Sequence, residues 1–165
     1  MMPQRIETPS GRRVKLAPEL LARIAPFVQR GDEDAEAVGV LLGRIVSESG
    51  AVIVDDATTP QPTDVRRRDG VDFDGSAHAY LISLALARSG GTCGYLGHWH
   101  THPEPDPTPS PVDLDDWSRR LREDTTDVDA VLFAIVGTRT IGVWEGLRSS
   151  GAITYAGHVP APEAL

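Results

Sequence analysis

Hydrophobic residues recur along the chain at helical spacing in three places. Between Leu16 and Arg30, apolar residues fall three or four positions apart with Pro18 in the first turn, and Gly31 closes the pattern. Further helices are expected from Asp74 to Arg88 and from Pro111 to about Arg122. The helix from Asp74 to Arg88 is expected to bury Ala77, Leu81, Leu84 and Ala85.

Between these helices, runs of apolar and β-branched residues predict strands. The run over 36–46 is too apolar for an exposed helix, and Ser49-Gly50 turns it into a second strand over 51–55, so the two should form a hairpin. Four shorter strands are expected over 93–99, 130–136, 140–144 and 152–155. The order αββαβαβββ predicts an α/β fold in which helices pack on a curved, largely antiparallel sheet.

The length fits one domain. A chain of 165 residues can bury about two-thirds of its unfolded surface around a single core. We expect that domain over residues 15–156, with a flexible leader over 1–14 and a loose tail over 157–165. The leader lacks the apolar stretch of a signal peptide, and no run reaches the ~20 apolar residues of a membrane span. A cytoplasmic protein without a membrane partner is therefore expected.

Charge and cysteine content narrow the partners and the metal chemistry. The chain carries 24 Asp plus Glu against 16 Lys plus Arg, a net charge of -8, which disfavours binding to the phosphates of nucleic acid. The single cysteine, Cys93, excludes an internal disulfide and any zinc site built on several thiolates. Cys93 is expected in a buried strand and not as a nucleophile, because no base that could activate its thiol is indicated beside it. Any bound metal must use histidine and carboxylate ligands.

Residues that suit such a metal gather in one segment, GHWHTHPEPDPTPSPVDLDDW, over 97–117. His100 and His102 alternate onto one side of a strand end, and Asp113 follows after ten intervening residues. Zinc accepts two imidazoles and a carboxylate, and three protein ligands leave the fourth tetrahedral position for water, as in catalytic sites. The sequence therefore predicts one Zn²⁺ per chain, held by His100, His102 and Asp113.

Other residues of this region have structural explanations as well. Ser110, Pro111 and Asp113 have the spacing of a helix start with a capping box, which would fix Asp113 and leave Ser110 free to donate toward an oxyanion. His98 should face the same side as His100, which leaves open a contact that supports the metal ligands. A role as fourth ligand is not expected, because a fourth protein ligand would displace the water. Packing roles are expected for Trp99 and Trp117, and a solvated loop for Arg66-Arg67-Arg68.

Two blocks of this sequence resemble the JAMM family of zinc metallopeptidases (MPN-plus, Mov34/JAB). The first is His100-Thr101-His102, then seven residues that begin with proline, Ser110, two more residues and Asp113. The second, Glu36-Ala37-Val38-Gly39-Val40-Leu41-Leu42-Gly43, is similar to the E-x-x-G-x-L-x-G setting of the family's glutamate. Around the histidines, YLGHWHTHPEP resembles most closely the short bacterial JAB peptidases of anti-phage (CBASS-type) operons.

The resemblance implies a fold and a reaction. The fold is the cytidine-deaminase-like MPN sandwich, a curved mixed sheet with flanking helices. Glu36 is implied as the general base that takes a proton from the attacking water and then, as general acid, hands it to the departing amine. Ser110 is implied to stabilise the oxyanion, with the metal held by His100, His102 and Asp113. The implied reaction hydrolyses the amide at the C-terminus of a ubiquitin-like protein. In such operons the partners are E1- and E2-like enzymes and a nucleotidyltransferase whose conjugation is reversed.

Two other functions stay open at this point. A peptidase could act on a sulfur-carrier protein or on a small-molecule amide adduct. A non-catalytic MPN scaffold is the alternative from another class, although the five residues of the catalytic set are all present. A zinc deaminase is excluded, because its H-x-E and P-C-x-x-C motifs need two cysteines. The ubiquitin-like partner, the type of amide bond and the oligomeric state do not follow from the sequence.

Overall fold

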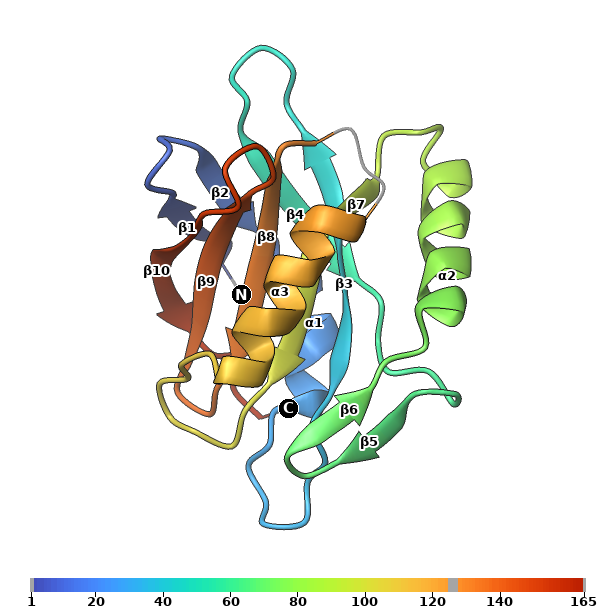
Figure 1. The fold of residues 1–165 in the computed structure, drawn as a ribbon, viewed down its shortest axis with the longest axis vertical. Coiled ribbons are helices and arrows are strands. Elements are labelled where there is room, and N and C mark those ends of the chain that lie inside the picture. Colours follow the sequence, from blue (N-terminus) through green and yellow to red (C-terminus); the bar gives the residue numbers. More distant parts are fainter. Residues whose placement is uncertain (1, 125–127, 165) are drawn as a thin grey trace.

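An eight-stranded mixed sheet forms the centre of the molecule, in a computed structural model that describes residues 2–124 and 128–164. The strand order is β1-β2-β4-β3-β7-β8-β9-β10, and the sheet curls so that the edge strands β1 and β10 lie side by side (Figure 1). The strands are β1 (Gln4–Glu7), β2 (Arg13–Leu16), β3 (Val38–Ile45), β4 (Val52–Ala57), β7 (Gly94–Thr101), β8 (Ala130–Val136), β9 (Thr140–Leu147) and β10 (Ile153–Pro160).

The remaining elements surround this sheet. The helices are α1 (Pro18–Ile24), which continues into a 3₁₀ turn over Ala25–Phe27, α2 (Gly75–Arg88) and α3 (Pro111–Glu123). A separate hairpin consists of β5 (Val65–Arg67) and β6 (Gly70–Asp72). In the main sheet β2 pairs parallel with β4 and β7 with β8, and the other pairs are antiparallel. The predicted α/β class, with a curved, largely antiparallel sheet and flanking helices, is confirmed.

Two apolar clusters occupy opposite faces of the sheet. In β8, Leu132, Ala134 and Val136 belong to the cluster that contains the helix α1, whereas the alternating residues Val131, Phe133 and Ile135 belong to the cluster under α3. Trp99 is buried in the first cluster and Trp117 in the second, so both have the expected packing roles. Figure 1 shows α3 lying across the sheet, and this packing determines where the first turn of α3 lies.

The first and last segments differ from the prediction, because both belong to the sheet. The leader contains β1 and part of β2, where Val14 is buried, and its turn is tied to β9 by a hydrogen bond from Ser10 Oγ to Glu145 Oε2 (2.8 Å). The expected tail over 157–165 continues β10 to Pro160, with Val159 buried. A flexible leader and a loose tail are therefore wrong for these residues. Four-residue strands are too short for their alternation to be recognised in the sequence.

Two helices also differ in detail from the expectation. The first ends at Ile24 rather than Arg30, because Pro26 lacks the amide hydrogen that a continuing helix needs. The expected apolar face of α2 is only partly buried, and its one fully buried side chain is His78. His78 donates from Nε2 to Asp64 (2.7 Å) and accepts at Nδ1 from the hydroxyl of Thr58 (2.7 Å). A polar contact thus anchors α2 to the sheet. Among the described residues, no helix is both long enough and apolar enough to cross a membrane.

Gly97 is predicted to be indispensable for the close approach of β7 to β8. A Cβ atom there would lie 1.7 Å from the carbonyl oxygen of Leu132, so Gly97→Ala should destabilise the fold by about 3 kcal/mol or more. Gly50→Ala is the matched control, because Gly50 also has positive φ but has open space around it, and should cost about 1–2 kcal/mol. Urea unfolding measures both. Equal losses in the two variants would contradict this packing.

Candidate metal centre and active site

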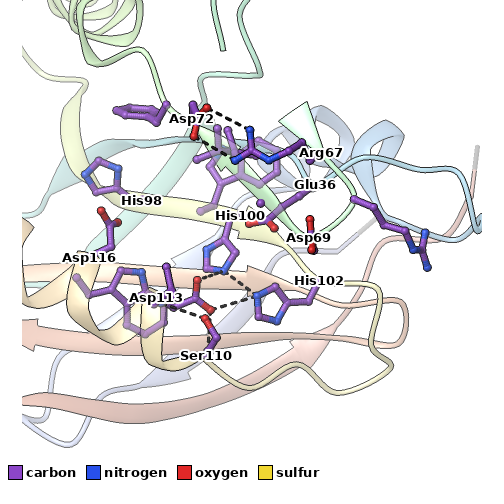
Figure 2. Close-up of a pocket in the computed structure, with 18 of the residues that line it drawn as sticks. Glu36, Arg67, Asp69, Asp72, His98, His100, His102, Ser110, Asp113 and Asp116 are labelled. Atoms are coloured by element: carbon purple, nitrogen blue, oxygen red, sulfur yellow. Dashed lines mark hydrogen bonds and ion pairs between the residues drawn. The ribbon is translucent and has the colours of Figure 1, made fainter. Parts of the chain in front are cut away.

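The end of β7 and the start of α3 meet in an open cleft. The cleft is also lined by the hairpin β5–β6 and by the segment before β3 (Figure 2). The antiparallel register of β3 and β7 places Val38 opposite His100. Glu36, two residues before Val38, therefore lies close to the two histidines. Residues far apart in the chain thus converge through sheet pairing.

The three predicted metal ligands lie in mutual contact. His100 Nε2 is 3.1 Å from His102 Nε2, and each of these nitrogen atoms is 3.2 Å from an oxygen of Asp113. A tetrahedral zinc ion with bonds of about 2.0–2.2 Å separates its ligand atoms by about 3.3–3.6 Å. The donor set and its spacing therefore fit zinc.

The N-terminus of α3 holds Asp113 by the predicted capping box. Ser110 Oγ accepts from the amide of Asp113 (3.1 Å), and Asp113 Oδ2 accepts from the amide of Ser110 (2.8 Å). Burial by itself would raise the pKa of Asp113, but hydrogen bonds from His100 and His102 outweigh it and lower the pKa. Asp113 is thus kept as the carboxylate that a metal binds. The hydroxyl hydrogen of Ser110 is left to donate to another group.

Glu36 is the second carboxylate beside the histidines, but it is placed differently. One ligand atom each of Glu36, His100 and His102 lie within 4.8 Å of one another, so these three could also hold a metal. Asp113 is at 3.2 Å from both imidazoles and therefore fits a direct ligand better. Figure 2 shows Glu36 on the hairpin side of the histidines and Asp113 on the α3 side. This arrangement leaves Glu36 free to exchange a proton.

The pKa of Glu36 is shifted in the direction that suits a proton acceptor. Burial raises it above the usual value for glutamate, although the neighbouring His100 and His102 act in the opposite direction. A base works best when its pKa approaches the operating pH. The site thus contains two carboxylates whose surroundings shift their pKa values apart, Glu36 upward and Asp113 downward.

His98 lies on the expected side of β7 but does not support the metal ligands. Its Nε2 donates to Asp124 at the C-terminal end of α3 (3.2 Å), and its ring stacks near Phe133. Burial outweighs the effect of Asp124 and lowers the pKa of His98 to about 4, so the ring is neutral. His98 thus contacts the C-terminal end of α3, whereas His100 and His102 contact Asp113 in its first turn.

Glu104 is a site residue that the sequence prediction missed. Its Oε1 accepts from Nδ1 of His102 (2.9 Å), which turns Nε2 of that ring toward His100 and Asp113. A carboxylate on the outer nitrogen of a metal-binding histidine fixes its tautomer and orientation. The only signal in the sequence is the H-x-E spacing of His102 and Glu104.

Comparison with known proteins shows the family of the chain. Residues 18–148 match the family described as prokaryotic homologs of the JAB domain. The chain belongs to this JAB family. A relative from Vibrio cholerae serotype O1, named "CD-NTase/cGAS isopeptidase", is 33% identical over 135 residues, which are 82% of this chain and 81% of the relative. A Pseudomonas aeruginosa protein with the same name is 38% identical over 114 residues, 69% of this chain and 70% of that protein.

Solved structures resemble the chain more distantly. The solution structure of protein DSY2949 from Desulfitobacterium hafniense superimposes with a TM-score of 0.48 and 16% sequence identity. The match covers 85% of this chain and 87% of that structure.

Glu104→Ala is predicted to weaken zinc binding by about 10–100-fold without unfolding the protein. The expected loss follows from the freed rotation of His102, whose outer nitrogen Glu104 holds. Competition with a fluorescent zinc chelator measures the affinity. Glu48→Ala, which removes an exposed carboxylate from the turn between β3 and β4, should leave the affinity unchanged. An unchanged affinity in Glu104→Ala would contradict the role of Glu104.

Proposed function

We propose that this JAB-family protein is a zinc-dependent isopeptidase that hydrolyses the amide at the C-terminus of a ubiquitin-like protein. The observation that carries the proposal is the convergence of His100, His102 and Asp113, with Glu36 beside them but outside their shortest contacts. The membership of the JAB family and the isopeptidase names of two relatives support it. A scaffold without catalysis would not need all five of these residues, Glu36, His100, His102, Ser110 and Asp113.

The chain's own residues divide the chemistry between them. Zinc, when bound by the two histidines and Asp113, would polarise the scissile carbonyl and make water more acidic. Glu36, whose pKa is raised by burial, takes a proton from the attacking water and delivers it to the departing amine. Ser110 donates its hydroxyl hydrogen to the oxyanion that forms at the carbonyl.

The relatives also suggest the partner. Both carry CD-NTase in their names. We therefore extend to this chain a substrate in which the C-terminus of a nucleotidyltransferase of this kind is conjugated through an amide bond. E1- and E2-like enzymes would form that bond, and this protein would reverse it in the cytoplasm as part of an anti-phage response. The open cleft leaves room for an extended peptide to reach the metal ligands.

Zinc content and cleavage together test the proposal. The substrate is a ubiquitin-like protein with a fluorescent amine attached to its C-terminus as an amide. We expect about one zinc per wild-type chain, which is lost together with cleavage in His100→Ala. Glu36→Gln should keep its zinc while kcat falls by about 10²–10⁴-fold, because only the proton transfer is removed.

Each contrary outcome has a definite meaning. Wild-type protein that binds no zinc would refute the enzyme and favour the scaffold. Zinc binding without cleavage would refute this substrate, and cleavage of a sulfur-carrier adduct in its place would favour the alternative peptidase. Loss of zinc in Glu36→Gln would show that Glu36 is itself a ligand.

A further inference from the structure

Glu36 lies on an irregular segment, not on a strand. Residues 31–37, between the 3₁₀ turn and β3, have neither helical nor strand conformation. The other four residues of the site are positioned by the end of β7 and by the capping box of α3. A reacting group that is misplaced by about 1 Å can cost 10²-fold in rate, so something must hold this segment in place.

Arg66 and Arg67 of β5 hold the main chain at Glu36 from the hairpin side. The amide of Glu36 donates to the carbonyl of Arg67 (2.7 Å). The guanidinium of Arg66 donates from Nε to the carbonyl of Glu36 (2.9 Å) and from Nη2 to the carbonyl of Ala35 (3.2 Å). The planar guanidinium thus spans two successive carbonyl groups, a fixed geometry that a flexible amine does not reproduce.

The other side of the segment is held by buried groups. Thr101, which lies between the two histidine ligands and is fully buried, accepts from the amide of Ala37 at Oγ1 (2.9 Å). The same hydroxyl donates to Gln29 (2.7 Å), whose amide nitrogen donates to the carbonyl groups of Asp34 and Arg68. These contacts belong to the fold. Arg66 is exposed, so it is the part of the arrangement that can be removed separately.

We propose that Arg66 is a positioning residue for the proposed reaction, which fixes the general base Glu36 by clamping the main chain of residues 35 and 36. Among the described residues, Arg67 and Arg68 line the cleft and Arg66 does not. Its guanidinium lies over the ring of Phe27, 5.6 Å from the centroid. Arg66 therefore acts through Glu36 and not on the substrate. The sequence prediction of a solvated loop is corrected: the run is exposed, but Arg66 and Arg67 form β5.

Arg66→Ala tests this role against a matched control. The control is Arg23→Ala, because Arg23 is also exposed and also donates two hydrogen bonds from its guanidinium, to Asp56 of β4, and neither residue lines the cleft. Arg66→Ala should lower kcat at least tenfold with KM within twofold and the same zinc content. Arg66→Lys should recover part of kcat, because one hydrogen bond can form again. Arg23→Ala should change none of these.

A second measurement does not depend on catalysis. Hydrogen exchange of the backbone amides of Glu36 and Ala37 should become at least tenfold faster in Arg66→Ala and stay unchanged in Arg23→Ala. The proposal is overturned if exchange at these amides is unchanged, or if kcat of Arg66→Ala stays within threefold of the control. Because the inference rests on the proposed function, a wild-type protein that cleaves nothing would refute that function, while the exchange result would still decide whether Arg66 holds Glu36.

Discussion

The antiparallel pairing of β3 with β7 is the constraint on which the site depends. Val38 lies opposite His100, so the start of one strand and the end of the other share an edge of the sheet. Trp99 points to the opposite face, where it is buried and donates to the carbonyl of Thr58 (2.9 Å). A slip of the register by one residue would turn the histidines into the core, so burial of the Trp99 face keeps His100 in the cleft. Glu36, His100 and His102 are therefore brought together by the same strand pairing that builds the core.

Helix α3 meets two demands at once. Trp117 stacks on Phe133 with ring centroids 4.7 Å apart, which anchors the helix to the sheet. Its first turn holds Asp113 through the capping box, and the helix direction sets where that carboxylate meets the histidines. In the cap Asp113 Oδ2 accepts from the amide of Ser110, which leaves Oδ1, 3.2 Å from Nε2 of His100, for the proposed metal. A structural cap and a metal ligand are thus compatible in one residue, and the rigid end of an anchored helix gives the ligand a defined position.

The sequence could predict those parts of the site whose residues lie close together in the chain. His100, His102, Ser110 and Asp113 lie within 14 consecutive residues, so strand alternation and a helix start were sufficient to place them together. Glu36 is distant in the chain and was found only through the family resemblance. Its support by Arg66 depends on the hairpin β5–β6, whose three-residue strands leave no recognisable pattern. For the same reason β1 was missed, because a strand of four residues carries little periodicity.

The central claim is that two histidines and Asp113 bind the metal while Glu36 remains free. The most direct measurement is a crystal structure of the protein soaked with zinc, with anomalous diffraction data collected at the zinc edge. We predict one anomalous peak about 2.0–2.2 Å from Nε2 of His100, Nε2 of His102 and an oxygen of Asp113, with the Glu36 carboxylate unbound. A peak bonded to Glu36 with Asp113 turned away, or a peak at another place in the molecule, would contradict the account.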